Sequence, residues 1–373
     1  MIAAGPLRPL VIQPTPFCNI DCSYCYLGNR SDRSRMTLDT IDAIARRIVA
    51  SPYAAEGVSV VWHAGEPTVV PPDWYEQAFV RLRAAARGAL RHSFQTNGIL
   101  IDERWIDLWR RWDVRVGVSV DGPADLHDAH RRTRAGRGTF DLTVAGLRRL
   151  RSAGLPFHVI TVLTREALDR PDDLLAFYCA EGVDYVCFNV EEREGTNAAS
   201  SLDGPDPAPL YRAFLARFAG RLRTERPGLR CREIDAVVGL AAAPPEMRRH
   251  NPQVRPLEIV SVAWDGGIST FSPELLGQPH PDYADFVFGD VRTDDLDDVL
   301  RHPAFRRLSA DVEAGVAACR ETCAYFGVCG GGAPANKLAE LRDVRGTETA
   351  FCRLTRKAVI DAVLPELEAE HVR

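Results

Sequence analysis

Two groups of cysteines have the residue type and the spacing to bind metal. The first lies in TPFCNIDCSYCYLGNR (15–30), where Cys18, Cys22 and Cys25 follow the pattern C-x3-C-x2-C. A closed zinc site takes four protein ligands and a [4Fe–4S] cluster prefers four cysteines, so three thiolates leave one position open. His63 could complete a zinc site of three cysteines and one histidine, whereas a cluster with one free iron could bind a small molecule.

The second group lies near the C-terminal end, in CRETCAYFGVCGGGAPANK (319–337), and Cys352 follows it at the start of an expected terminal helix. Four thiolates fill a four-cysteine site, which suits an iron–sulfur cluster or, as the alternative, zinc. The glycines at 330–332 would let the backbone turn tightly around it. Three cysteines stand apart from both groups and are expected to be small buried hydrophobes: Cys179, Cys187 and Cys231.

Composition limits the partners of this chain. It has 373 residues, a formal net charge of -5 and no separate block of Lys and Arg, so we expect neither nucleic acid nor a membrane surface as a partner. No apolar run is long enough to span a bilayer, and MIAAGPLRPLVIQP at the start does not resemble a signal peptide. We therefore expect a cytoplasmic protein whose clustered cysteines serve metal binding or catalysis.

Apolar, β-rich runs alternate with helical patterns through the first half of the chain. Strands are expected at 9–14, 58–62, 92–96, 114–120, 157–163 and 184–190, and helices near 37–50, 73–88, 103–111, 139–153 and 171–181. Such strand–helix units predict an α/β fold with a parallel sheet buried on both faces. They are too few for a complete eight-fold barrel, so we expect a partial (β/α)6 barrel.

Polar motifs follow the expected strands, at the edge where a parallel sheet gathers its ligands. The first cysteine group follows strand one, and HAGEP (63–67), TNG (96–98) and SVDGP (119–123) follow the next three. Each motif alone is ordinary turn chemistry. Four of them at one edge of one sheet, beside three cysteines, predict a shared ligand site.

The three-cysteine loop resembles that of the radical SAM superfamily, with Tyr24 as the aromatic residue before the last cysteine. The resemblance implies a [4Fe–4S] cluster held by Cys18, Cys22 and Cys25, with the amino and carboxylate groups of S-adenosylmethionine (SAM) on the fourth iron. It also implies reductive cleavage of SAM to a 5′-deoxyadenosyl radical, which takes a hydrogen atom from the substrate while the protein orients the cofactor.

The same resemblance assigns cofactor-binding roles at the strand ends. AGEP matches a Gly-Gly-Glu segment of the family, with Ala64 in place of the first glycine, a change expected to cost little. The backbone of Gly65 would then contact the methionyl amino group, with Glu66 beside it. Ser119 matches a serine that contacts the ribose or the carboxylate, and Asn97 would shape the adenosyl side of the pocket.

An arginine is also expected at the cofactor. Arg131, in HDAHRRTR, matches an arginine that contacts the SAM carboxylate in related maturases. Arg132 is a rival for this role. The alternative is that both belong to a solvated basic loop.

Together with this core, the second cysteine group resembles a SPASM-type domain, which carries auxiliary iron–sulfur clusters. The match is partial: in SVAWDGGISTFSPELLG (261–277) the family's Asp-Gly hairpin is present, but Phe271 stands where a cysteine is expected. The resemblance thus implies one auxiliary [4Fe–4S] cluster, bound by Cys319, Cys323, Cys329 and Cys352. The expected organisation is a radical SAM partial barrel over 1–205, a helical bridge over 206–255 and a SPASM-like domain over 256–373.

Motifs along nearly the whole chain resemble the cyclophane-forming peptide maturases of the GrrM/OscB type. This implies an enzyme that abstracts a side-chain β-hydrogen from a ribosomally made precursor peptide and links that carbon to an aromatic ring. An external donor such as flavodoxin or ferredoxin would supply electrons. Rearomatisation releases a proton, for which Glu274 in FSPELLG is the expected acceptor and Asp265 the alternative. Alternatively, Glu274 is a surface residue that caps a short turn and has no catalytic role.

Other functions stay open at this point. A sulfatase-type maturase would oxidise Cys or Ser to formylglycine, and a third option is thioether formation; relatives of both kinds usually keep the full set of SPASM cysteines. From another class, a zinc-stabilised peptide-binding protein would need no redox chemistry. Because no leader-binding domain is recognisable, we expect precursor capture at the barrel mouth, at the 193–210 loop or by a separate partner.

Overall fold

The structure is a computed structural model that describes residues 4–226 and 228–371. Within these residues one sheet has nine strands in the order β7-β6-β5-β4-β3-β2-β1-β8-β9. Its first six strands in chain order are parallel to their neighbours: β1 (Pro9–Ile12), β2 (Val58–Trp62), β3 (Leu90–Thr96), β4 (Arg115–Ser119), β5 (Phe157–Leu163) and β6 (Tyr185–Val190). All six strands expected from the sequence are therefore confirmed.

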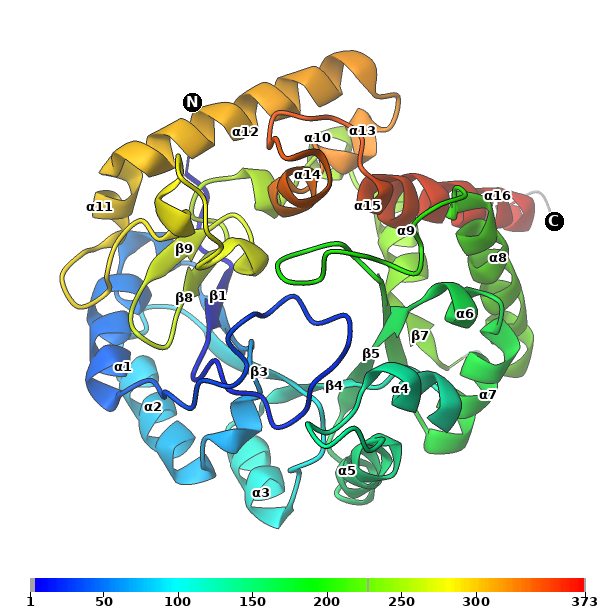
Figure 1. Cartoon of the computed structure of the whole chain (residues 1–373), viewed down its shortest axis with the longest axis horizontal. Helices are drawn as coiled ribbons and strands as arrows, with labels where there is room; N and C mark the ends of the chain where they lie inside the picture. Colours follow the sequence, from blue (N-terminus) through cyan, green and yellow to red (C-terminus); the bar gives the residue numbers. More distant parts are fainter. Residues whose placement is uncertain (1–3, 227, 372–373) are drawn as a thin grey trace.

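Helices surround the sheet as an outer ring (Figure 1). Those of the first half are α1 (Leu38–Ile44), continued by a π-helical turn (Ala45–Val49), α2 (Pro72–Ala85), α3 (Glu103–Arg111), α4 (Ala124–His130), α5 (Phe140–Ser152), α6 (Arg165–Leu168) and α7 (Pro171–Glu181). Side-chain caps mark several starts: Thr37 accepts from the amide of Thr40, and Asp102 from that of Trp105. The expected partial (β/α)6 barrel is confirmed.

Aromatic rings hold α2 against the sheet. Trp62 on β2 and Phe94 on β3 are buried, and both pack edge-on to Tyr75 of α2, with ring centroids 5.0 and 4.9 Å apart. Buried rings of this size contribute much of the apolar area of a core, and edge-to-face contacts add to it. This packing fixes the strand ends from which the site is built.

The hairpin at 260–270 extends the sheet rather than standing apart from it. Strand β8 (Val260–Val262) runs parallel to β1, and β9 (Ile268–Thr270) pairs antiparallel with β8 across the expected Asp-Gly turn. The three-part domain division stays a prediction. The structure adds that the region expected to be SPASM-like shares a sheet with the barrel.

The remaining elements follow β6 along the chain, and β7 pairs with β6 at one end of the sheet. They are α8 (Ala208–Glu225), β7 (Arg230–Cys231), α9 (Arg232–Ala242), α10 (Pro245–Arg248), α11 (Leu296–Arg301), α12 (Pro303–Thr322), α13 (Phe326–Cys329), α14 (Pro334–Leu341), α15 (Ala350–Cys352), a π-helical turn (Arg353–Ala358) and α16 (Val359–His371). Single 3-10 turns lie at Pro52–Ala54, Pro67–Val69, Pro252–Val254, Pro273–Leu275 and Ala284–Phe286.

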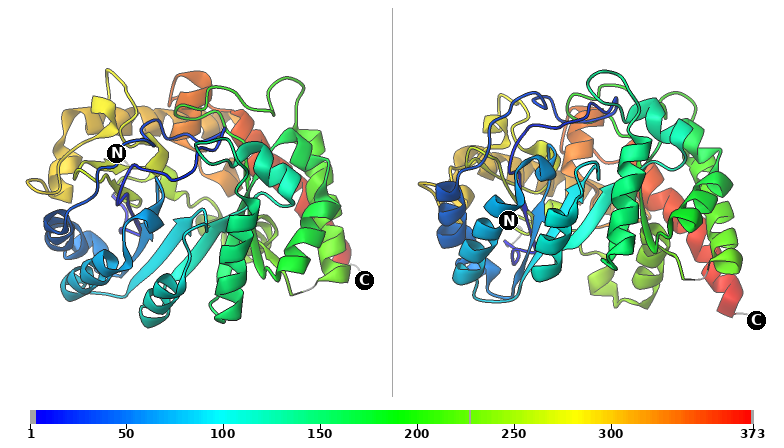
Figure 2. Two further views of the ribbon diagram at one scale, coloured as in Figure 1. Left: turned by 60° about the horizontal axis from the view of Figure 1, so that its bottom comes forward. Right: turned by 90° about the horizontal axis from the view of Figure 1, so that it is seen from below.

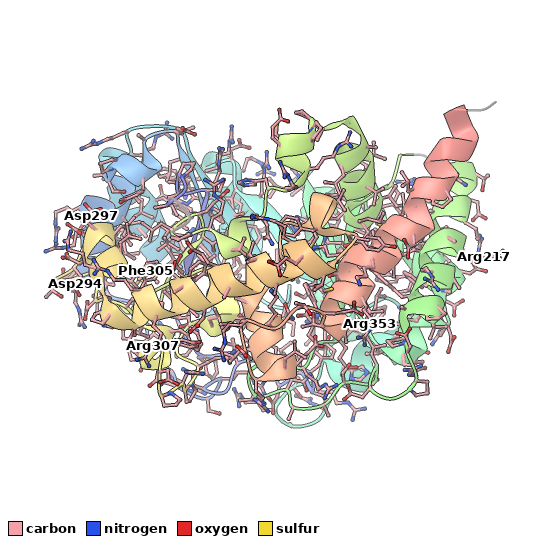
Figure 3. All side chains as sticks on the ribbon, turned by 90° about the horizontal axis from the view of Figure 1, so that it is seen from above. Arg217, Asp294, Asp297, Phe305, Arg307 and Arg353 are labelled. Carbon is pink, nitrogen blue, oxygen red and sulfur yellow. The ribbon has the colours of Figure 1, made fainter. Side chains whose placement is uncertain are left out.

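The terminal helical segment starts at the second cysteine group, as expected. Residues 350–371 are helical, and α16 packs against α8 and α9. Figure 3 shows α12 and α16 crossing the same face of the molecule, with Phe305 labelled on α12. In the part of the chain that the structure describes, no helix combines the length and apolar character that a membrane span needs.

Candidate active site

The three-cysteine loop lies between β1 and α1, across the carboxyl ends of the strands (Figure 2). A second segment, after α4, holds it in place. The amide of Asp21 donates to the carbonyl of Arg132 at 2.7 Å, and the amide of Ser23 to that of His130 at 3.1 Å. Ile20 and Thr133 form an antiparallel bridge between the same two segments. The loop is therefore fixed by backbone from far along the chain.

Arg131 is buried, with 7% of its surface exposed. Its Nε donates to Oδ2 of Asp121 at 2.9 Å, its Nη1 lies 4.0 Å from Sγ of Cys22, and the Tyr24 hydroxyl donates to the same Asp121 carboxylate. The solvated-loop alternative is thus wrong for Arg131, whereas Arg132 is exposed. Burial is the largest influence and acts to raise the pKa of Asp121, but Arg131, His127 and the hydrogen bond from Tyr24 together hold the pKa below its usual range.

The turn after β2 contains two left-handed residues in succession. Gly65 has φ of +64°, and a Cβ there would lie 2.3 Å from the carbonyl oxygen of Thr15 and 2.7 Å from that of Phe17, so only glycine fits. Ala64 has φ of +67°, which costs an L-residue roughly 1–2 kcal/mol. The alanine is therefore less neutral than the sequence suggested.

Glu66 is buried inside the protein, with 1% of its surface exposed. Its Oε1 accepts from the amide of Thr68 at 2.9 Å and from the hydroxyl of Thr96 at 2.7 Å, and its Oε2 accepts from the amide of Asn97 at 2.7 Å. Burial raises the pKa of this carboxyl, and these hydrogen bonds oppose the shift. The side chain ties the turn after β2 to the turn after β3.

Asn97 and Ser119 also sit at the strand ends, in different surroundings. Asn97 donates through Nδ2 to Oδ1 of Asn19 at 2.7 Å, and the same nitrogen lies 3.9 Å from Sγ of Cys18. It therefore contacts the cysteine loop. Ser119 accepts from Nε2 of Gln95 at 2.9 Å.

One cavity of about 610 Å³ brings most of the expected site residues together. In Figure 1 two segments that border it, the loop at 13–37 in dark blue and the loop after β6 in green, lie inside the ring of helices. Its lining includes the following residues named from the sequence: Cys22, Tyr24, Cys25, His63, Ala64, Gly65, Ser119, Arg131 and Glu274. Strand ends, cysteine loop and the turn after β9 therefore converge on one space.

An acidic wall on this cavity was not foreseen. It is made by Glu192 and Glu194, directly after β6, together with Glu274. Burial raises the pKa of Glu192 to about 8; Glu274 adds to the shift, and a hydrogen bond from Asn336 opposes it. Burial, Glu274 and Glu192 likewise raise the pKa of Glu194. The rule that ligands gather at carboxyl ends of parallel strands would have pointed to these two residues as well.

Glu274 and Asp265 occupy different places. Glu274 lies in the 3-10 turn after β9, lines the cavity and accepts a hydrogen bond from the Ser272 hydroxyl. His63 lines the same cavity; burial lowers its pKa, and Glu274 opposes that shift. Asp265 is exposed at the hairpin turn, where its Oδ1 accepts from the amide of Gly267 at 3.2 Å.

The second cysteine group converges on a separate cavity of about 270 Å³. Cys319, Cys323, Cys329 and Cys352 all line it, from the ends of α12, α13 and α15. At Gly330, whose φ is +70°, a Cβ would lie 2.2 Å from the carbonyl oxygen of Arg249. Phe271, which stands where the SPASM pattern has a cysteine, is fully buried and stacks on Phe305 with ring centroids 5.9 Å apart.

Both donor sets fit iron–sulfur clusters. Cys22 and Cys25 line the large cavity, with Cys18 in the same loop, and four cysteines line the small cavity. Among the described residues, no three His, Cys, Asp or Glu side chains converge as ligands of a single metal ion. A cubane instead takes its thiolates at separate corners.

The isolated cysteines behave largely as expected. Cys187 and Cys231 are buried, and Cys179 is half-buried. The thiol of Cys231 lies 3.5 Å from Oε2 of Glu233, within the core between β7 and α9.

Known proteins are similar in sequence to this chain over different lengths. The model of the radical SAM superfamily matches residues 12–178. An uncharacterized protein of Synechocystis sp. is 41% identical over 370 residues, covering 98% of this chain and 93% of the relative. Serine-type anaerobic sulfatase-maturating enzymes of Bacteroides thetaiotaomicron and Klebsiella aerogenes are 27% and 30% identical, and the match spans 52% and 50% of their lengths.

Solved structures share the fold across the whole chain. Native anSMEcpe with bound AdoMet and Cp18Cys peptide has a TM-score of 0.77 at 18% identity, covering 99% of this chain and 100% of that one. Streptococcus suis SuiB bound to precursor peptide SuiA has a TM-score of 0.66 at 17% identity, covering 94% and 76%.

The chain belongs to the radical SAM superfamily of enzymes and is related to the anaerobic sulfatase-maturating enzymes. Its cofactors are accordingly a [4Fe–4S] cluster and SAM. The alternative of a non-enzymatic, zinc-stabilised binding protein is therefore wrong.

Proposed function

We propose that this enzyme matures a ribosomally made precursor peptide by abstracting a side-chain β-hydrogen and linking that carbon to an aromatic ring. The observation that carries the proposal is the 610 Å³ cavity, whose lining extends from Cys22 and Cys25 to the acidic wall. A bent peptide segment needs a space of this kind, with hydrogen abstraction at one end and proton acceptors at the other. Solved structures with this fold include anSMEcpe with bound Cp18Cys peptide and SuiB bound to precursor peptide SuiA.

Different residues of the chain would bind the cofactors and orient the cysteine loop. When bound, SAM and the cluster on Cys18, Cys22 and Cys25 would supply hydrogen-atom abstraction from the substrate. The buried Arg131–Asp121 pair, only 4.0 Å from Cys22, keeps the cysteine loop oriented. Gly65 and Ser119 would contact SAM from the strand ends.

Linking carbon to ring leaves one proton and one electron to remove. Glu274 would accept the proton, because it lines the cavity as a carboxylate held by Ser272. The four-cysteine site would hold the auxiliary [4Fe–4S] cluster that accepts the electron. An external donor such as flavodoxin or ferredoxin would supply electrons for SAM cleavage.

A second candidate is a sulfatase-type maturase that oxidises Cys or Ser to formylglycine. The identities of 27% and 30% to sulfatase-maturating enzymes favour it. Against it, Phe271 fills the position of a SPASM cysteine, so the cluster set differs from the full pattern. Thioether formation is a third candidate. The chemical structure of the product would distinguish it from the other two.

The test is the product formed on a short precursor encoded beside this enzyme, labelled with deuterium at candidate β-carbons. We expect label in 5′-deoxyadenosine, and a peptide that has lost a pair of hydrogens and carries a carbon–carbon crosslink. Tandem mass spectrometry locates that crosslink. An aldehyde, a thioether or label retained at the β-carbon would move the enzyme to one of the other candidates.

Glu274→Gln separates proton acceptance from hydrogen abstraction. We expect deuterium transfer to 5′-deoxyadenosine to continue while crosslinking slows by about 10²-fold or more, the usual loss on removing a general base. Asp265→Asn is the matched control, since Asp265 is an exposed carboxylate at the turn of the preceding hairpin and does not line the cavity. Equal crosslinking by Glu274→Gln and the control would show that another group takes the proton.

A further inference from the structure

A buried lysine lies against the four-cysteine cavity. Lys337 of α14 is 2% exposed, and its Nζ donates to Sγ of Cys319 at 3.5 Å. Glycines make room for it: a Cβ on Gly315 would lie 3.1 Å from Nζ, and a Cβ on Gly332 would lie 3.3 Å from Cε. Gly332 and Lys337 of CGGGAPANK thus pack against each other beside Cys319.

Among the described residues, this ammonium group has no carboxylate partner. Within residues 4–226 and 228–371, no ion pair of Lys337 occurs, and Cys319 is the one side-chain acceptor recorded for its Nζ. Burying an unpaired charge costs several kcal/mol, so native proteins pair such groups. The missing negative charge must come from the cysteine site itself, and a cubane with four thiolate ligands carries such a charge.

We propose that Lys337 is the buried counter-charge of the auxiliary cluster and raises its reduction potential through Cys319. Hydrogen bonds to cluster sulfurs and nearby positive charge both stabilise the reduced, more negative state. Lys337 is a positioning residue, since it acts through a ligand. The inference deepens the proposed function: the ring adduct gives one electron to the cluster and one proton to Glu274, and Lys337 makes that electron transfer more favourable.

The chain offers a matched control in Lys357, which lines the same cavity. Its Nζ pairs with Oε2 of Glu348 at 2.5 Å, and its side chain is 24% exposed. Water and the paired carboxylate screen this charge. The same Lys→Met change should therefore affect the cluster much less at 357 than at 337.

The experiment is anaerobic redox titration of the reconstituted full-length holoenzyme, followed by electron paramagnetic resonance. Added SAM perturbs the first cluster and so identifies the signal of the auxiliary one. In Lys337→Met and Lys337→Gln, we expect the equilibrium constant for one-electron reduction of the auxiliary cluster to fall about tenfold, a shift of about 59 mV to more negative potential. Lys337→Arg and Lys357→Met should stay near wild type.

Iron and sulfide contents are measured for every variant. An unchanged potential in a neutral variant with full cluster content overturns the proposal, as does zinc in place of iron at these cysteines in wild type. Loss of the auxiliary cluster from both neutral variants but not from Lys337→Arg supports a counter-charge. Loss from all three shows that side-chain shape matters rather than charge, and also overturns it. Since no peptide enters the titration, its result is independent of the crosslinking reaction.

Discussion

Gly65 and Ala64 show how one turn limits the residues at the site. Gly65→Ala places a methyl group against two backbone carbonyls at positive φ, so we expect a loss of about 2–5 kcal/mol in the free energy of unfolding. Ala64→Gly relieves the positive φ at the neighbouring position and should be neutral or stabilising by up to about 1 kcal/mol. Urea unfolding of the two variants beside wild type measures this. Equal stability of Gly65→Ala and wild type would contradict the described turn.

Glu192 should make stability depend on pH. Its pKa is raised from 4.5 to about 8, chiefly by burial, so between these values the folded state holds a proton that the unfolded state has released. Stability therefore falls as pH rises through this window. Relative to wild type, Glu192→Gln should gain roughly 1–2 kcal/mol on going from pH 5 to pH 8.5, less than the full shift implies because some solvent contact remains.

Thermal unfolding at the two pH values measures that difference. Asp265→Asn, at an exposed turn, is the control and should shift the melting temperature equally at both. A Glu192→Gln effect that is the same at pH 5 and pH 8.5 would mean that this carboxyl titrates normally.

At the scale of elements, the site is an assembly of loops on strand ends. The cysteine loop contacts the segment after α4 on one side and the loop after β6 on the other, where the amide of Thr196 donates to the carbonyl of Tyr26 at 3.0 Å. A Cβ on Gly195 would lie 2.2 Å from that same carbonyl oxygen. The loop is thus held from two sides, which keeps Cys22 and Cys25 at the cavity.

Replacing Cys18, Cys22 and Cys25 together by alanine should empty this loop without emptying the second site. We expect about four irons to remain, one cubane on the C-terminal cysteines. Formation of 5′-deoxyadenosine under reducing, oxygen-free conditions should vanish, because no open iron is left. Iron analysis and chromatography of the SAM products check both points. Continued cleavage of SAM by the triple variant would show that the cluster is bound elsewhere.

At the scale of the whole molecule, one sheet links the two cysteine sites. β1 leads into the first group, and β8, which pairs with β1, leads through the hairpin toward Glu274 and the helices of the second group. The β8–β9 hairpin extends the sheet beyond β1, and the turn after it carries Glu274, so the acidic wall and the cysteine loop line the same cavity.

The reconstituted wild type should contain about eight irons, in two cysteine-bound cubanes. Cys231→Ala serves as control, since Cys231 is buried beside Glu233 and lines neither cavity. Its iron content should match wild type. A wild-type count near twelve would reveal a further cluster, and a drop in Cys231→Ala would identify one of its ligands.

The strand–helix units, the two cysteine groups and the Asp-Gly hairpin could all be predicted from the amino-acid sequence. These follow from local spacing: apolar periodicity depends on neighbours a few residues apart, and the three thiols of the first group lie within eight residues. The rule for parallel sheets then placed HAGEP, TNG and SVDGP at one edge, where the structure has them.

Which side chains face one another across that edge became visible in the folded chain. Asp121 meets Arg131 and Tyr24, Glu192 and Glu194 meet Glu274, and Lys337 meets Cys319. The first contact joins a strand end to two loops, and the second joins the end of β6 to a turn beyond β9. The physical reason is that burial and charge pairing depend on which segments the sheet order brings together, and no local spacing in the chain encodes that order.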